Sequence, residues 1–210
     1  MEKLKVLIMP GHYANSPGAL SDPSISITEY ETVYTISENA YLRLQGNEHI
    51  EPMLFFDSDL KGKKEHIDSE KPDIIIENHM NWSRFKNTNG VLTVFEEGNA
   101  ESKILATEVN DTLAKLLLMK NYGIFSHKEI KGWRKWKNFF IFDRIEYNSD
   151  VMMYDVPTIL TEIGYLSNVR LATSIMKSSD FVDRAGLAIA KAIDKYAKQF
   201  FELKNTNFIF

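Results

Sequence analysis

Short apolar runs alternate along this chain with longer segments whose apolar residues recur at helical spacing. The first run, KLKVLIM at residues 3–9, is of the kind that a parallel sheet buries on both faces. Further strand-like runs are HIEPMLFF, PDIIIENHM, GVLTVFEE, NFFIFDR and VPTILTEIGYLSN. Strands that alternate with helices indicate an α/β fold. We therefore predict a single α/β domain with a mainly parallel, twisted central sheet flanked by helices on both faces.

Capping residues and apolar stripes mark the helices between these runs. Thr28 and Glu31 have the spacing of a capping box, which predicts a helix that begins near Glu29. The apolar residues on one face of this helix are Val33, Ile36 and Ala40. A long amphipathic helix is predicted over residues 100–120, and two helical stretches end the chain, the clearer of them at residues 180–200.

The composition narrows the classes of partner and of chemistry. The chain has 210 residues, 44% of them hydrophobic, which suits one globular domain; we place it at residues 1–203, with a C-terminal tail at 204–210. The polar segment 57–72 is predicted to be mostly loop, with one helical turn. A formal net charge of -4 does not favour a nucleic-acid partner. The chain has no cysteine, so that any metal must be held by His, Asp and Glu.

The lengths of the apolar runs test two features, an N-terminal signal peptide and a transmembrane segment. Two lysines precede the first apolar run, as in a signal peptide, but the run before Pro10 is shorter than the roughly 7–15 apolar residues of a signal core. No run approaches the ~18 apolar residues of a membrane span. We therefore expect no signal peptide, no transmembrane segment, and synthesis in the cytoplasm.

Three ionisable residues stand at the ends of predicted strands: His12, His79 and Glu162. In open α/β sheets the binding crevice lies beyond the carboxyl ends of the strands. Ionisable groups beside apolar runs are costly to bury unless they are paired or bind a metal. Glu29, in the first turn of the next helix, can face the same crevice. Each also has an ordinary interpretation: His12 could end a turn, Glu29 could favour a helix N-terminus, and Glu162 could pair with a Lys or Arg.

The types of these residues favour metal-assisted hydrolysis. Two histidines and one carboxylate form a frequent catalytic zinc set, with water in the remaining position. A further carboxylate that is not a ligand can then transfer protons. The groups are scattered along the chain and show no local motif such as H-E-x-x-H, so that their spacing alone does not establish the chemistry.

Four motifs carry a resemblance to a known family. They are PGH at 10–12, ITE at 27–29, NHMN at 78–81 and PTILTEIGYLSN at 157–168. In this order they resemble the signatures of the zinc-dependent N-acetylmuramoyl-L-alanine amidases of the amidase-3 type. The segment at 89–113 is also similar to that family's strand and helix after the second histidine. The resemblance covers nearly the whole chain, and its last motif is the most specific.

The resemblance implies a zinc ion held by three side chains and a glutamate that transfers protons. The implied ligands are His12, Glu29 and His79, and the implied catalytic residue is Glu162. Glu31 is the alternative carboxylate ligand, but its use would break the predicted capping box. Residues that bind the substrate are not predicted.

The activity that the resemblance implies is hydrolysis of the amide between N-acetylmuramic acid and L-alanine in peptidoglycan. Zinc would polarise the carbonyl and acidify its water. Two alternatives stay open: a zinc exopeptidase or amidohydrolase that acts on free peptides, and a non-catalytic wall-binding protein of the same fold. The expected partner is peptidoglycan, and the expected place of action is the cell wall, as a phage lysin or an enzyme of mother-cell lysis. The oligomeric state is not predicted.

Three positions depart from the family's pattern. Met9 stands where the family usually has Asp, Tyr13 where it has Gly, and Glu77 where it has Ser. Ligating histidines usually donate their other ring N–H to an acceptor, so that losing a carboxylate near His12 should cost orientation. We predict that Glu77 supplies this acceptor from the neighbouring strand end.

The basic and aromatic segment HKEIKGWRKWKNFFIF, residues 127–142, admits more than one interpretation. It could be a nucleic-acid stacking patch, but with this net charge an exposed loop that leads into a strand is preferred. Contact with the cell-wall polymer is a third interpretation. His49, His66 and His127 lie in polar surroundings and are expected to be solvated.

Overall fold

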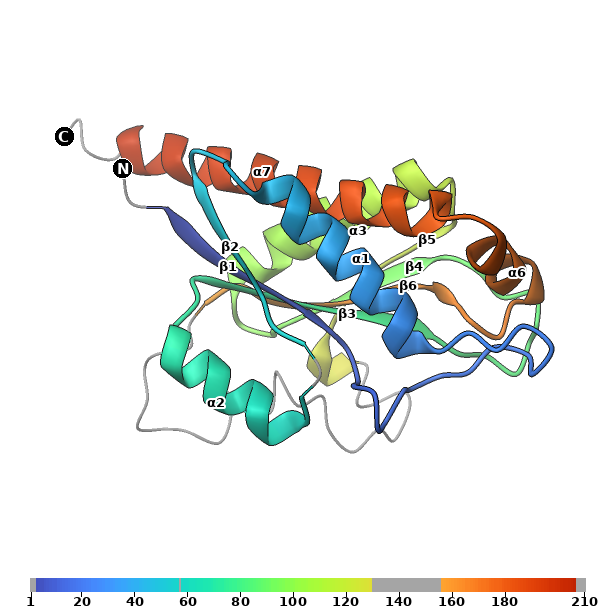
Figure 1. The fold of residues 1–210 in the computed structure, drawn as a ribbon. Helices are drawn as coiled ribbons and strands as arrows, with labels where there is room; N and C mark the ends of the chain where they lie inside the picture. Colours follow the sequence, from blue (N-terminus) through green and yellow to red (C-terminus); the bar gives the residue numbers. More distant parts are fainter. Residues whose placement is uncertain (1–2, 57, 130–155, 207–210) are drawn as a thin grey trace.

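The structure is a computed structural model, and it describes residues 3–56, 58–129 and 156–206. In this part of the chain six strands form one sheet in the order β2-β1-β3-β6-β4-β5 (Figure 1). The strands are β1 (Leu4–Pro10), β2 (Ile50–Leu54), β3 (Ile74–Asn81), β4 (Val91–Phe95), β5 (Asn121–Ser126) and β6 (Thr158–Tyr165). Strands β2, β1, β3 and β6 are parallel, whereas β4 is antiparallel to β6 and parallel to β5. The predicted α/β class with a mainly parallel sheet is confirmed.

Helices cover both faces of this sheet. They are α1 (Glu29–Leu44), α2 (Leu60–Glu70), α3 (Ala100–Leu117), α6 (Val169–Lys177) and α7 (Asp180–Thr206). In Figure 1, α1, α3 and α7 lie over one face and α2 lies against the other. No helix in the described part of the chain is both long enough and apolar enough to cross a membrane.

The alternation of side chains along β3 sorts its residues between the two layers. Ile74, Ile76 and Met80 belong to the core that α1, α3 and α7 share with the sheet. Ile75 belongs to the smaller core on the other face, together with Ile67 of α2. Because side chains alternate along a strand with a period of two, Glu77 and His79 share the face of Ile75. The sequence of β3 thus directs two ionisable residues toward the face that α2 covers.

The start of α1 matches the sequence pattern. The Thr28 hydroxyl accepts a hydrogen bond from the Glu31 backbone N–H at 3.2 Å, and the Glu31 carboxylate accepts one from the Thr28 N–H at 3.4 Å. This is the predicted capping box, and the helix begins at Glu29 as predicted.

Two elements differ from the prediction. The segment predicted to be mostly loop, 57–72, contains the helix α2; the Asp59 carboxylate caps it by accepting a hydrogen bond from the Gly62 N–H at 2.9 Å. Lys63 and Ile67 are buried on this helix, so that a lysine interrupts the apolar stripe that would have indicated a helix. Strand β5 was not predicted, because it is a largely half-buried edge strand without a buried apolar run.

Two other predictions fall outside the described residues or stay untested. The strand predicted at NFFIFDR, residues 138–144, lies outside the described residues. The domain limits at 203 and 204 stay a prediction, and α7 continues to Thr206.

Candidate metal centre

The carboxyl ends of β1, β3 and β6 meet the start of α1 at one edge of the sheet. His79 near the end of β3 is the register partner of Glu162 on β6. His12 follows the end of β1, and Glu29 is the first residue of α1. The structure therefore brings these four predicted residues to the edge at which an open α/β sheet binds ligands.

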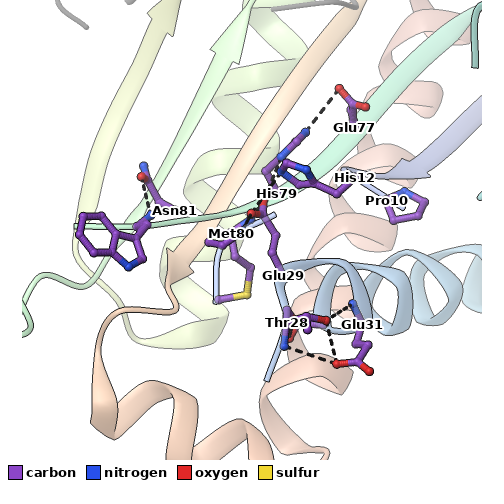
Figure 2. A network of polar contacts seen from close by, with 12 residues as sticks. Pro10, His12, Thr28, Glu29, Glu31, Glu77, His79, Met80 and Asn81 are labelled. Atoms are coloured by element: carbon purple, nitrogen blue, oxygen red, sulfur yellow. Dashed lines mark hydrogen bonds and ion pairs between the residues drawn. The ribbon is translucent and has the colours of Figure 1, made fainter. Parts of the chain in front are cut away.

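The Glu29 carboxylate lies between the two imidazoles (Figure 2). Its Oε1 is 2.9 Å from His79 Nδ1, and its Oε2 is 3.2 Å from His12 Nε2. The two rings meet edge to face, with centroids 5.1 Å apart. One ligand atom from each of the three residues can be chosen so that all lie within 4.8 Å of one another. Such a spacing is compatible with three ligands of a single metal ion.

Two backbone N–H groups fix the orientation of the Glu29 carboxylate. Ala19 donates to Oε2 at 2.7 Å, and Met80 donates to Oε1 at 3.0 Å. The side chain is buried. Burial alone would raise the pKa of Glu29, but hydrogen bonds from His12 and His79 outweigh it and hold the pKa well below its usual value. The carboxylate is therefore ionised and held in one place.

The electrostatics around His79 favour positive charge. Burial lowers the pKa of His79, but its hydrogen bonds to Glu29 and Glu77 have the larger combined effect and raise it to about 10. Burial likewise raises the pKa of Glu77, but the ammonium of Lys63 and the contact with His79 lower it to about 2. Two ionised carboxylates on either side of an imidazole create a potential that suits a cation.

Glycines let the backbone approach the cluster closely. A Cβ at Gly11 would lie 2.3 Å from His79 Cε1, and a Cβ at Gly18 would lie 2.4 Å from Glu29 Oε2. Gly18 also has a φ of +75°, and His12 itself has a φ of 61°, in the left-handed region. The backbone of the loop after β1 therefore packs closely against the side chains of His12, Glu29 and His79.

The donor set fits zinc. Two imidazole nitrogens and one carboxylate oxygen are the protein ligands of many catalytic zinc sites, which keep a further position open for water or substrate. Glu31 lies apart from this cluster, because its carboxylate accepts a hydrogen bond from the Thr28 hydroxyl at 2.7 Å in the cap of α1 (Figure 2). Of the two glutamates that the sequence left in competition, Glu29 is the one that contacts both histidines.

A cavity of about 870 Å³ opens beside the cluster. His12, Glu29 and His79 line it together with Glu162, whose side chain is buried. Trp82 also lines the cavity and is 52% exposed, which places an aromatic surface at its margin. A substrate in this cavity would therefore contact the cluster and Glu162 at the same time.

A hydrogen-bonded asparagine connects the elements that carry these residues. The Asn78 side chain accepts a hydrogen bond from the Thr161 hydroxyl at 2.8 Å and donates one to the Ser37 hydroxyl at 2.9 Å. All three side chains are buried. They join β3 to β6 and to α1, which fixes the relative positions of His79, Glu162 and Glu29.

The prediction for Glu77 is wrong in its target. Glu77 Oε2 lies 3.5 Å from His79 Nε2, so that its imidazole partner is His79 rather than His12. Side chains on β3 two residues apart share a face, whereas His12 has already left β1 and turned with its positive φ. Lys63, which pairs with Glu77 at 2.7 Å, was missed. Its spacing of four residues from Ile67 was the only available signal.

The remaining histidines are less exposed than predicted. His127 is buried, and its Nδ1 accepts a hydrogen bond from the Glu97 N–H at 3.1 Å. His66 is half-buried and stacks on Phe55 with ring centroids 4.0 Å apart. His49 is also half-buried and lies next to Phe201. Polar neighbours in sequence did not reveal these packing partners. Residues 130–142 of the basic segment lie outside the described residues.

Comparison with known proteins gives the chain a family. The model of the family described as N-acetylmuramoyl-L-alanine amidase, Amidase_3, matches residues 6–195. No curated protein matches the sequence at a significant level.

Solved structures of N-acetylmuramoyl-L-alanine amidases and of an endolysin share the fold. The enzyme from Clostridium difficile 630 is 20% identical with a TM-score of 0.75, and the alignment covers 93% of this chain and 97% of that one. The catalytic domain of CwlV from Bacillus (Paenibacillus) polymyxa var. colistinus is 23% identical with a TM-score of 0.72 and coverage of 93% and 99%. The catalytic domain of the CD27L endolysin targeting Clostridia difficile is 17% identical with a TM-score of 0.62 and coverage of 90% and 96%. Because the family model spans most of its length, the chain belongs to the amidase-3 family of N-acetylmuramoyl-L-alanine amidases and is an enzyme of that class.

Proposed function

We propose that the protein is a zinc-dependent amidase that hydrolyses the bond between N-acetylmuramic acid and L-alanine in peptidoglycan. The observation that carries this proposal is the convergence of His12, Glu29 and His79, with one ligand atom from each within 4.8 Å of the others. Family membership supports the amidase chemistry. The donor set and the cation-favouring electrostatics support zinc as the cofactor.

The residues divide the chemistry between them. Zinc, when bound, supplies Lewis-acid chemistry, because it polarises the scissile carbonyl and makes water more acidic. His12, His79 and Glu29 would hold it. Glu162 would take a proton from the attacking water and pass it to the nitrogen of the leaving amine as the C–N bond breaks. The products are a muramic acid carboxylate and a peptide with a free L-alanine amine.

The proposed partner is peptidoglycan and the proposed place of action is the cell wall. A role in lysis, as a phage lysin or an enzyme of mother-cell lysis, is part of this proposal. The likeness in fold to the catalytic domain of the CD27L endolysin supports it, because that protein's name assigns it to lysins.

Mass spectrometry of the products from purified sacculi tests bond, substrate and metal together. We expect stem peptides with free L-alanine amino termini and intact glycan strands. A chelator should abolish their release, and added zinc should restore it. Hydrolysis of free peptides without release from sacculi would instead support the exopeptidase or amidohydrolase alternative. Bound zinc without any cleavage would support a non-catalytic wall-binding protein.

Glu162→Gln tests the proposed proton transfer. The amide keeps the size of the side chain but cannot accept and return a proton, so that activity should fall by about 10² or more. Zinc content and the circular dichroism spectrum should stay those of the unmodified protein. Glu65→Gln, at an exposed position of α2, is the matched control and should cleave sacculi at the normal rate. Near-normal cleavage by the Glu162 variant would exclude this role.

A further inference from the structure

A buried lysine lies directly behind the candidate metal centre. Lys63 of α2 is 1% exposed, and its Nζ donates hydrogen bonds to Glu77 Oε1 at 2.7 Å and to the carbonyl oxygen of Pro10 at 2.8 Å. Desolvating two charges is costly, and well-packed apolar residues in place of a buried ion pair often leave stability unchanged or improve it. Stability alone therefore does not explain why this pair is present.

The lysine contacts both strand ends that lead to the histidines. Pro10 ends β1, two residues before His12, and Glu77 lies on β3, two residues before His79. These ends are already neighbours, because Pro10 is the register partner of Asn78. One ammonium group thus joins α2 to the two segments that carry the imidazoles.

The second oxygen of Glu77 faces the imidazole of His79. Glu77 Oε2 is 3.5 Å from Nε2, whereas Nδ1 on the opposite side of the ring is 2.9 Å from Glu29 Oε1 (Figure 2). The two nitrogens of His79 therefore have different surroundings: Nδ1 faces the cluster, and Nε2 faces a carboxylate outside it. When a metal takes Nδ1, the remaining ring proton is on Nε2, where the Glu77 carboxylate can accept it.

We propose that Glu77 and Lys63 are positioning residues for His79. Glu77 accepts the Nε2–H of His79 and presents Nδ1 to the proposed zinc ion, and Lys63 holds the Glu77 carboxylate in the orientation that this requires. The ammonium also pairs with the Glu77 carboxylate, so that the orienting carboxylate is not a buried charge without a partner. This inference rests on the proposed zinc site and deepens it.

Zinc affinity measured by competition with a chromogenic chelator tests the inference. Loss of an outer partner of a ligating histidine typically weakens metal binding 10–100-fold, and we expect a loss of about this size for Glu77→Gln and for Lys63→Met. Lys64→Met, at an exposed position of the same helix, is the matched control and should bind zinc normally.

The double variant Lys63→Met/Glu77→Met separates positioning from folding. Each single variant leaves one buried charge without its partner and is expected to lose thermal stability. The double variant removes both charges and keeps the volume, so that it should regain most of the melting temperature and still bind zinc 10–100-fold more weakly. Normal affinity in the double variant would overturn the inference.

Nitrogen-15 NMR of the imidazoles in the zinc-loaded proteins gives a readout independent of activity. In the unmodified protein the Nε2–H of His79 should show the downfield proton shift and slow solvent exchange of a hydrogen bond to a carboxylate, and in the double variant this signature should be lost. An unchanged His79 signature in the double variant contradicts a positioning role, even if the unmodified protein binds zinc and cleaves sacculi. Failure of the unmodified protein to bind zinc would overturn the proposed cofactor and the inference together.

Discussion

The Glu29 carboxylate is oriented both by its place at a helix N-terminus and by backbone hydrogen bonds. As the first residue of α1 it gains from the helix dipole, and it also accepts hydrogen bonds from the backbone of Ala19 and Met80. Its remaining contacts are with His12 and His79. The carboxylate is therefore oriented by the fold itself, before any ion arrives, and little reorganisation is needed for binding.

Glu29→Gln separates the two glutamates that the sequence left in competition. We expect zinc affinity to fall by more than the roughly 10–100-fold that loss of an outer partner costs, because a ligand charge is removed. Zinc retained after dialysis, measured by atomic absorption, reports this loss. The control is Glu31→Gln, which should retain zinc and lose at most about 1 kcal/mol of stability through the cap. The reverse outcome would make Glu31 the ligand.

Gly11→Ala tests how tightly the backbone is packed on His79. The added methyl group would lie 2.3 Å from His79 Cε1, so that the imidazole must move. We expect weaker zinc binding together with a loss of about 1–3 kcal/mol from overpacking. Gly46→Ala is the control, because it adds a methyl group at a positive φ with no atom within 4 Å. That variant should lose stability and keep its zinc affinity, as isothermal calorimetry would show.

At the scale of residues, the sequence predicts those members of the candidate site that are ionisable and stand at the end of a predicted strand or just after a helix cap. His12, His79 and Glu162 follow apolar runs directly, and Glu29 follows a recognisable cap. Lys63 could not be predicted, because lysines are almost never fully buried and its partner Glu77 is on another element. Its spacing of four residues from Ile67 puts both on one side of a helix, but its contact with Glu77 is tertiary and is not encoded by a local pattern.

At the scale of elements, α2 shows how a buried lysine interrupts the apolar pattern by which a helix is recognised in a sequence. Its segment is rich in Lys and Glu, and the face toward the sheet offers Lys63 where a helical stripe would have an apolar residue. Ile67 then remains to pack against Leu7, Met9 and Ile75. The apolar periodicity of this helix in the sequence is therefore weak.

Ile67→Ala tests this dependence on one apolar side chain. Ile67 is fully buried, and its truncation should cost about 2–5 kcal/mol in the free energy of unfolding. Urea denaturation followed by circular dichroism measures the change. Lys64→Ala, one turn earlier on the exposed side, should change the stability by no more than about 0.5 kcal/mol. A small effect of Ile67→Ala would mean that the stability of α2 does not depend on this side chain.

At the scale of the whole molecule, the direction of β4 follows from the length of a connection. Residues 82–90 join β3 to β4, and this is shorter than the dozen or more residues that a crossover between parallel strands needs. Strand β4 therefore runs antiparallel to β6, and the crossover through α3 makes β5 parallel to β4. The apolar runs in the sequence predicted the sheet. They did not predict the reversed direction of β4, which follows from the number of residues that connect β3 to β4.

Removal of zinc should change the stability of the whole molecule without unfolding it. A ligand at 100 times its Kd stabilises the folded state by about 2.7 kcal/mol, so that a chelator should lower the melting temperature by several degrees. The zinc-free protein should still melt cooperatively, because Glu29 and the two histidines contact one another directly. Differential scanning calorimetry with and without chelator measures the shift. Glu29→Gln should not respond to the chelator.

The direction of β1 decides how the enzyme can be tethered. Its carboxyl end opens on the cavity beside the candidate metal centre, so that its first residue, Leu4, lies at the opposite rim of the sheet. The C-terminal end of α7 lies near the start of β1 (Figure 1). Phe200 and Phe201 of α7 line a small hollow together with Leu4. A targeting module or a label fused to either end would therefore be attached behind the sheet. Such a fusion could hold the enzyme on an insoluble polymer while the cavity stays open to it.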